Sequence, residues 1–152
     1  MLAIPIQPQG IKGSHSSVSP IPKSRPVERY IERFIIFAKE GHLDGLQKIL
    51  KEAGPVKTEI LSKLSFHGTT ALHEAARSGH CEVMGFLLEY QTIIDSRNGK
   101  TGGTPLLAAV ASGSEDCINL LLTKGANPDL ETRSGLTPRK LAIKKGLDHL
   151  FT

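Results

Sequence analysis

A pattern of glycine, threonine and alanine recurs three times along this chain, from Gly68 onward. Each copy has glycine two residues before a threonine, alanine five residues after the threonine, and glycine four residues after the alanine. The threonines are Thr70, Thr104 and Thr137, so the copies are 34 and 33 residues apart. Self-similarity at this period indicates a solenoid, in which each unit buries its apolar face against the next.

Each column of the repeat has a structural reason. Threonine at a helix N-cap accepts a hydrogen bond from a backbone N–H that would otherwise lack a partner. Proline follows the threonine in two copies and fits the first helical position, where its missing N–H costs nothing. The small alanine lets a neighbouring helix approach closely, and the later glycine suits a left-handed C-cap. The expected unit is a turn, a short helix, a tight turn and a longer helix. The columns are Thr70, Thr104 and Thr137; Pro105 and Pro138; Ala75, Ala109 and Ala142; Gly79, Gly113 and Gly146; and the leucine pairs 87–88 and 121–122.

A helix pair precedes the first copy. Apolar residues at helical spacing predict a helix over 29–39, ended by Gly41, and a second helix from Leu43, stopped at Gly54. The segment 59–64 predicts an additional helical turn. This pair lacks the threonine entry, as expected of an N-terminal capping unit.

Residues 1–27 differ from the rest of the chain in composition. They contain five prolines and no acidic residue, so they cannot bury enough apolar surface to offset their conformational entropy. The expected organisation is a disordered Pro/Ser-rich arm over 1–27 and one domain over 28–152. The units of that domain are expected at about 29–67, 68–101, 102–134 and 135–152.

The three copies resemble ankyrin repeats, which have a period of 33 residues and the signature T-P-L-H-x-A. This resemblance covers roughly residues 66–150 and implies an all-α solenoid of stacked helix-turn-helix units with β-turn or hairpin connections. The last copy departs from the signature at Arg139 and Lys140, which suits a terminal cap with a solvated face. The chain ends before a full second helix, so the cap is short or the sequence is part of a longer protein. The matching segments are Thr70-Ala71-Leu72-His73-Glu74-Ala75, Thr104-Pro105-Leu106-Leu107-Ala108-Ala109 and Thr137-Pro138-Arg139-Lys140-Leu141-Ala142.

The sequence His73-Glu74-Ala75-Ala76-Arg77 is one residue away from the zinc-binding motif H-E-x-x-H. Arg77 stands where the second histidine ligand would be, and arginine is not a metal ligand. The resemblance implies instead that His73 ties neighbouring repeats by hydrogen bonds. His80 and Cys81 could be imagined as a metal or nucleophile pair, but the next copy has Ser114 and Glu115 there.

A phosphate-binding loop is excluded as well, because Ile94 stands where the motif ending in Gly99-Lys100-Thr101 requires its first glycine. We therefore expect no catalytic residue, no cofactor and no metal site, and the chain is not expected to be an enzyme.

Charge and cysteine content bear on the kind of partner and on the cell compartment. The net charge is +4, but the basic residues are scattered and aromatic residues are only 5% of the chain. This favours neither specific nucleic-acid binding nor membrane binding. We interpret Cys81 and Cys117 as buried free thiols, which suits a reducing compartment. Without a signal peptide or a transmembrane segment, an intracellular location, cytoplasmic or nuclear, is expected, and secretion by a route that needs no signal peptide is the alternative.

In ankyrin-type proteins the turn tips and first helices line a concave ledge that binds other proteins. The resemblance therefore implies a non-catalytic interaction module, an adaptor or a sequestering inhibitor. The alternative is the targeting fragment of a larger enzyme or host-directed effector whose catalytic part is absent. We expect a monomer whose positive ledge favours an acidic segment, with the arginines as the first candidates for contact. The ledge residues are Glu74, Arg77, Ser78, Val110 and Ser112 on the first helices, and Arg97, Asn98, Lys100, Thr101, Glu131, Thr132, Arg133 and Ser134 on the turns.

Overall fold

The computed structural model describes residues 26–62, 68–90 and 93–152, and these residues form helices, turns and loops without a strand. The predicted arm over 1–27 lies almost entirely outside the described residues. The elements are α3 (Pro26–Glu40), α4 (Leu43–Ala53), η3 (Gly54–Val56), α5 (Lys57–Ser62), α6 (Ala71–Ser78), α7 (Cys81–Glu89), α8 (Pro105–Ser112), α9 (Glu115–Thr123), α10 (Pro138–Lys145) and η4 (Asp148–Phe151).

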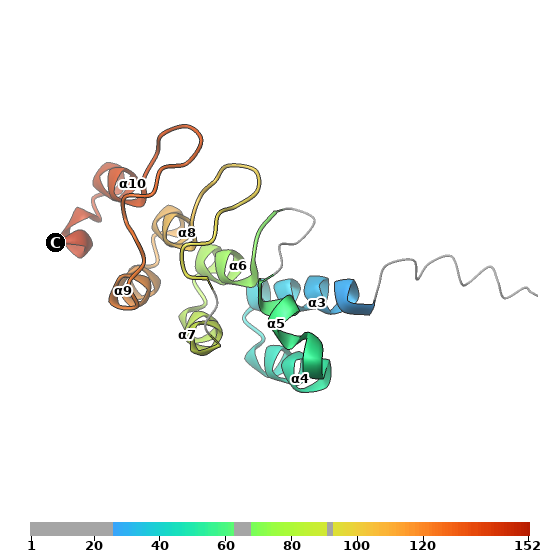
Figure 1. Ribbon diagram of the computed structural model, residues 1–152. Coiled ribbons are helices and arrows are strands. Elements are labelled where there is room, and N and C mark those ends of the chain that lie inside the picture. The colour runs from blue at the N-terminus through green and yellow to red at the C-terminus, as the bar shows by residue number, and fades with distance from the viewer. Residues whose placement is uncertain (1–25, 63–67, 91–92) are drawn as a thin grey trace, which may run out of the picture.

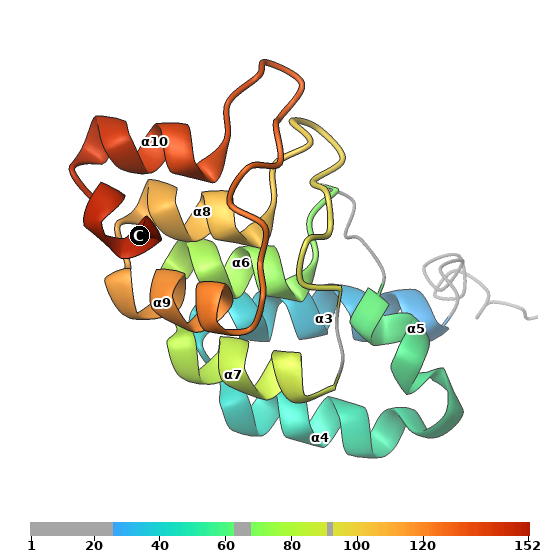
Figure 2. The same ribbon diagram turned by 60° about the vertical axis from the view of Figure 1, so that its left-hand side comes forward.

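The helices lie in two rows. An inner row is formed by α3, α6, α8 and α10, each packed against the next, and an outer row by α4, α7 and α9 (Figures 1 and 2). Two long loops, over 95–103 and 127–136, project from one end of the inner row beside each other (Figure 2). The chain is therefore the stack of helix pairs that its repeat predicts.

The caps of the first helices confirm the columns of the repeat. The hydroxyl oxygens of Thr70, Thr104 and Thr137 accept from the backbone N–H three residues later. Pro105 and Pro138 occupy the first turns of α8 and α10. The C-cap glycines Gly79, Gly113 and Gly146 adopt φ values of 76°, 77° and 73°, which glycine reaches without a Cβ clash.

The core follows the two rows. The repeated alanines Ala75, Ala109 and Ala142 are fully buried in the inner row, where their small side chains allow the helices to pack closely. Leu87 and Leu121, the first members of the predicted leucine pairs, are fully buried in the outer row. Burial on this scale supplies the main favourable free energy of each interface between units.

Successive loops are joined through their backbones. Gly99 N–H donates to the carbonyl of Gly68 at 2.7 Å, and Arg133 N–H donates to that of Thr101 at 2.9 Å. A Cβ built on Gly68 would meet backbone atoms of Gly99 at 3.0 Å, and Gly68 has a φ of +76°. The equivalent glycines Gly102 and Gly135 lack such a close contact but share the positive φ, at +75° and +80°, so the left-handed backbone explains why glycine precedes the threonine in the repeat.

The N-terminal helix pair is present, with differences at its ends. α3 begins at Pro26, where proline is tolerated in a first turn, and so starts before the predicted residue 29. The predicted helical turn after Gly54 is α5, which ends at Ser62. At the other end of the stack, η4 takes the place of a second helix in the last unit.

The prediction of free thiols is wrong. Cys81 and Cys117 form a disulfide, with their Cα atoms 5.1 Å apart, and it joins α7 to α9. Their separation of 36 residues exceeds the repeat period by two residues. Two residues turn a helix by about 200°, so Cys81 faces the next unit and Cys117 faces back to meet it. The argument for a reducing compartment therefore loses its basis.

Candidate protein-binding surface

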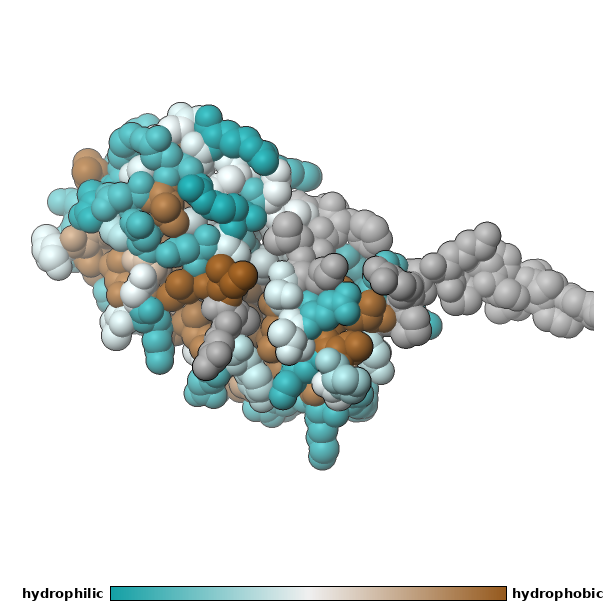
Figure 3. Space-filling view, in the orientation of Figure 1, coloured by the Kyte–Doolittle hydropathy of each residue, from teal (hydrophilic) through white to brown (hydrophobic). Residues whose placement is uncertain are grey.

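The ledge is defined here as the exposed face of α6, α8 and α10 together with the loops 95–103 and 127–136. Hydrophilic side chains cover the projecting loops, and hydrophobic patches are exposed elsewhere in the same view (Figure 3). Arg77, Ser78 and Ser112 lie exposed near the C-terminal ends of α6 and α8. The fold therefore brings the predicted helix and loop residues to one side of the stack.

Two of the predicted ledge arginines bridge the loops. Arg97 Nη1 donates to the carbonyl of Gly102 in its own loop and to that of Glu131 in the next loop. Arg133 Nη1 donates to the carbonyls of Gly99 and Lys100 in the preceding loop. Both side chains are exposed, yet their donors hold the fold together, and neither charge is cancelled by a carboxylate in these contacts.

Asn98 and Val110 do not lie at the surface. Asn98 is 8% exposed, and its Oδ1 accepts from the N–H groups of Lys100 and Thr101, which closes the first loop. Val110 is fully buried in the core, so its prediction as a ledge residue is wrong. It occupies the face of α8 that packs inward, next to the buried Ala109.

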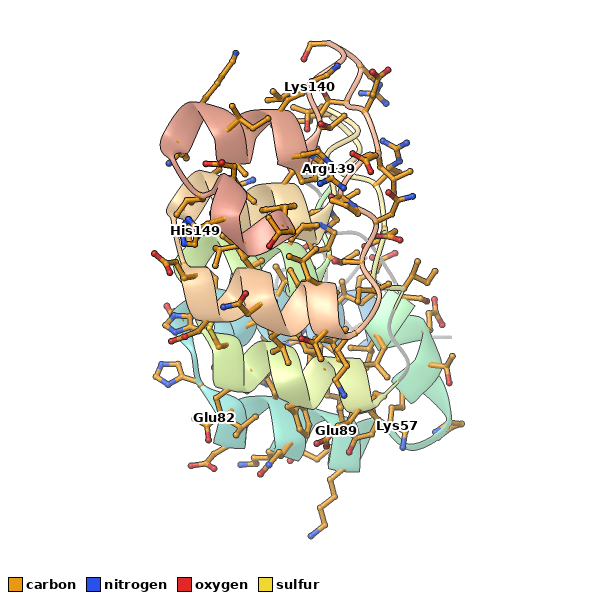
Figure 4. All side chains as sticks on the ribbon, turned by 90° about the vertical axis from the view of Figure 1, so that its left-hand side faces the viewer. Lys57, Glu82, Glu89, Arg139, Lys140 and His149 are labelled. Carbon is orange, nitrogen blue, oxygen red and sulfur yellow. A yellow bond between two sulfur atoms is a disulfide. The ribbon has the colours of Figure 1, made fainter. Side chains whose placement is uncertain are left out.

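The second loop is held by residues of α10 that the prediction did not include. Arg139 pairs with Asp129 through two hydrogen bonds of 2.7 and 3.1 Å, and Lys140 Nζ lies 3.3 Å from Glu131 Oε1. Figure 4 shows both basic residues beside this loop. The hydrogen bond from Arg139 lowers the pKa of the Asp129 carboxyl below its ordinary value. The departure from the ankyrin signature at Arg139 and Lys140 was the signal for these contacts.

The hydroxyl groups of the ledge divide into bonded and free ones. Thr132 Oγ1 is 3.0 Å from Ser134 Oγ and accepts from Leu136 N–H. Ser112 Oγ donates to the carbonyls of Ala109 and Ala76, and the second bond crosses to the preceding unit. Ser78 makes no side-chain hydrogen bond within the described chain.

Three cations on the ledge have no partner among the residues that the structure describes. The guanidinium of Arg77 and the ammonium groups of Lys100 and Lys144 make neither a hydrogen bond nor an ion pair there. All three side chains are exposed. They are therefore available to a ligand at no cost to the fold.

A groove of about 360 Å³ lies on the ledge between α6 and α8, beneath the first loop. Arg77 of α6 and Thr101 of the loop line it, and Leu107, Ala108 and Ala111 of α8 form its apolar wall. Positions 104, 107–108 and 111 of one helix share a face, since they are three to four residues apart. The prediction did not include these apolar residues, although Leu107 departs from the histidine of the signature.

His73 lies at the floor of this groove in a structural role. Its Nε2 is 3.0 Å from the carbonyl of Gly103, and its Nδ1 is 2.9 Å from Thr70 Oγ1 and 3.3 Å from the Thr70 nitrogen. A ring that donates from Nε2 and accepts at Nδ1 is neutral. Burial also lowers the pKa of His73 below its ordinary value. These contacts tie α6 to the next loop, as the ankyrin resemblance implies.

The described residues contain neither a metal-binding cluster nor a membrane-spanning helix. No three side chains of His, Cys, Asp or Glu there gather as the ligands of a metal ion would. None of the helices in that part of the chain has both the length and the apolar character needed to cross a membrane.

The similarity of this chain to known proteins covers its stacked units. A family model described as "Ankyrin repeats (3 copies)" matches residues 34–132. The E3 ubiquitin-protein ligase KEG of Arabidopsis thaliana is 35% identical over 104 residues, 65% of this chain and 6% of that protein. The B-cell lymphoma 3 protein homolog of Mus musculus is 36% identical over 104 residues, 67% of this chain and 22% of that protein. The NF-kappa-B inhibitor cactus of Drosophila melanogaster is 35% identical over 80 residues, 51% of this chain and 16% of that protein. The chain thus spans less than a quarter of the length of each of these three relatives.

Proposed function

Because the chain belongs to the ankyrin-repeat family, we propose that it is a non-catalytic protein–protein interaction module that acts as an adaptor or a sequestering inhibitor. Domains of this family are generally interaction modules and generally non-catalytic. One relative is named as an inhibitor, which supports the second role. The observation that carries the proposal is the ledge, where Arg77 and Lys100 present charges that the fold does not use.

We propose the residues that contact the partner according to which side chains of the ledge the fold leaves available. Arg77, Ser78 and Lys100 are exposed and have free side chains. Thr101 is also exposed, and its Oγ1 accepts from the N–H of Gly103. Arg97 and Arg133 contribute positive charge while their donors hold the loops, and Asn98 shapes the first loop from within. Ser112, Glu131 and Thr132 flank this set and complete the proposed contact surface.

The partner we propose is a protein with an acidic segment. Arg77, Lys100, Arg97 and Arg133 all bring positive charge to the ledge, and the carbonyl oxygens that two of them contact do not neutralise it. Complementary charge raises the association rate and selects the partner. Scattered cations without interleaved aromatic residues favour neither nucleic acid nor a membrane surface. We further propose that residues 28–152 act as one monomeric domain, with the arm over 1–27 as a second contact that raises avidity.

The test is affinity capture of partners from a lysate of the source cells, with three baits. The full chain is compared with a ledge variant, Lys100→Glu/Ser134→Glu, and with an outer-row control, Lys48→Glu/Lys124→Glu. All four positions are exposed, so the three baits should keep the same helical content and melting temperature. We expect a protein that is retained by the full chain and the control and lost by the ledge variant.

Equal recovery of every bound protein on all three baits would contradict the proposal that the ledge binds. Both variants convert two exposed residues to glutamate. A lysine-to-glutamate change alters charge twice as much as the serine-to-glutamate change, so the control carries the larger change in net charge. If a protein is lost from the ledge variant alone, the loss therefore depends on where the substitutions lie and not on the amount of charge changed.

A second candidate function is the targeting part of a larger enzyme or effector. It is favoured by the relatives, one of which is an E3 ubiquitin-protein ligase of which this chain spans 6%. The test is the nucleotide sequence of the source locus beyond the codon for Thr152. An open reading frame that continues into a catalytic domain would support this candidate, and a stop codon at that place would remove it.

A further inference from the structure

The groove between α6 and α8 differs in chemistry from the equivalent positions of the neighbouring units. The wall positions Leu107, Ala108 and Ala111 of α8 correspond to His73, Glu74 and Arg77 of α6 and to Lys140, Leu141 and Lys144 of α10. The middle unit therefore presents an apolar strip where its neighbours present mostly charged or polar side chains. Leu107 and Ala108 are half-buried and Ala111 is exposed, so the strip is open to a ligand.

Cations flank this apolar strip on both sides. Arg77 lines the groove on α6 and has no partner among the described residues. On the other side, Lys145 of α10 donates from Nζ to the carbonyl of Ala111 at 2.7 Å, so its charge lies beside the strip and is not cancelled by that oxygen. Among the described residues that line the groove none is acidic. The local field therefore favours a negative group next to an apolar one.

We propose that this groove binds an extended segment of a partner protein in which an aliphatic side chain lies on Leu107, Ala108 and Ala111 and a nearby carboxylate pairs with Arg77. This inference rests on the proposed function and names the chemistry of its partner. In an extended chain, residues two positions apart point to the same side and are about 7 Å apart. Both side chains must point into the groove, so we place the aliphatic and the acidic residue two positions apart in the segment.

The free state of Arg77 is central to this assignment. A guanidinium offers a planar fork that pairs with a carboxylate through two hydrogen bonds. Arg97 and Arg133 each have Nη1 engaged by two loop carbonyls, whereas the guanidinium of Arg77 makes no hydrogen bond among the described residues and can meet a carboxylate without rearrangement. Burial of an aliphatic side chain on the α8 strip adds apolar contact, which a phosphate or an isolated carboxylate would not provide.

The experiment selects random 12-residue peptides displayed on phage against the immobilised full chain. Enriched peptides are made with a fluorescent label, and their Kd values are measured by fluorescence anisotropy. We expect enriched sequences to contain Asp or Glu two positions from Leu, Ile or Val. Their binding should weaken at least about tenfold on Arg77→Glu and on Ala111→Glu, since like charge across an interface is strongly unfavourable, and stay within about twofold on the control Lys48→Glu.

A charge exchange completes the test. A peptide whose acidic residue is changed to Lys should bind Arg77→Glu better than it binds the natural chain. Melting curves of each variant check that the fold is kept, and all three substituted positions are exposed.

Three outcomes would overturn the inference: no enriched peptide, enriched peptides without the acidic–aliphatic pair, or equal binding to Arg77→Glu and the natural chain. If captured proteins or peptides are lost on Lys100→Glu/Ser134→Glu but not on Arg77→Glu, the ledge function stands and the groove assignment falls. If neither capture nor selection yields a ligand, both fall together.

Discussion

One side-chain difference between neighbouring units changes how their loops are held. His73 of α6 reaches the carbonyl of Gly103 in the next loop at 3.0 Å. The equivalent residue of α8 is Leu107, which has no polar atom to offer. The loop that follows is held instead by Arg97 and Arg133, which cross between the loops. The sequence alone shows the missing histidine, but the arginines that replace its function are visible only in the stacked units.

The first prediction concerns the pH dependence of stability at His73. Burial lowers its pKa below the ordinary value of 6.5, so the unfolded chain binds the proton more readily than the folded one. The contribution of this group is present above pH 6.5 and is lost as pH falls below that value towards the folded pKa. Urea denaturation from pH 7.5 to 5.0 should therefore show a falling free energy of unfolding, and His73→Leu should make this fall shallower.

The same variant should be about 1–3 kcal/mol less stable at pH 7.5, because the buried Gly103 carbonyl loses its donor. The exposed Lys48 serves as the control, and Lys48→Met should keep the pH dependence of the natural chain. An unchanged slope in His73→Leu would mean that other groups cause the acid sensitivity. Glu74 and Arg77 act on His73 in opposite directions, raising and lowering its pKa.

At the scale of the elements, each projecting loop is held from inside and from its neighbour. Asn98 closes the first loop by accepting from two backbone N–H groups, and Gly99 N–H reaches Gly68 in the preceding connection. Arg139 and Lys140 of α10 hold the second loop by its carboxylates. The loops are thus ordered parts of the stack, which keeps the groove and the free cations in place for a partner.

The second prediction separates structural cations from free ones. Arg133→Met keeps the apolar stem but removes both hydrogen bonds to the preceding loop, so we expect a loss of about 1 kcal/mol in the free energy of unfolding. Lys100→Met removes a charge without a partner in the described structure, and its change should stay within about 0.5 kcal/mol. Urea denaturation of both variants at neutral pH is the measurement.

Equal free energies of unfolding for the two variants would show that the Arg133 side chain contributes no more to stability than that of Lys100. Arg133→Lys is a further comparison, since a single ammonium lacks the planar, spread donors of arginine. It should recover only part of the loss.

At the scale of the whole molecule, the chain is a one-dimensional stack in which each unit contacts only its neighbours. The inner row packs continuously from α3 to α10. In the outer row, the disulfide between Cys81 and Cys117 adds a covalent link between two units. The middle of the stack, which carries the groove, is therefore tied in both rows.

The third prediction is that this disulfide stabilises the stack by about 2–4 kcal/mol, chiefly by restricting the unfolded chain. Reduction should lower the melting temperature of the natural chain, measured by circular dichroism with and without a phosphine reductant. The variant Cys81→Ala/Cys117→Ala should melt lower without reductant and should not respond to it. Mass spectrometry after thiol alkylation confirms the redox state in each sample.

Alkylation shows whether both thiols are free after reduction. If they are free and the natural chain still melts at the same temperature as before reduction, the prediction is wrong. Both cysteines are at the start of outer-row helices, away from the ledge. Reduction should therefore change stability more than it changes the Kd for a ledge ligand at temperatures well below melting.

The sequence by itself determined the repeating unit, its caps and the family. These features are local, because the threonine N-caps, first-turn prolines and left-handed glycines act within a few residues of their own helix. Ala75, Ala109 and Ala142 were likewise readable as core residues from their shared column. The same columns showed where the units depart from one another, at Leu107 and at Arg139.

Only the tertiary structure decided which residues are used by the fold and which remain available. Arg77, Arg97 and Arg133 were equivalent candidates in the sequence, yet two of them bridge loops 34 residues apart and one is free. Cys81 and Cys117 meet because a two-residue offset turns them towards each other across stacked helices. Such contacts depend on which faces of neighbouring units meet, and that is set by the packing of the whole stack and not by any local pattern.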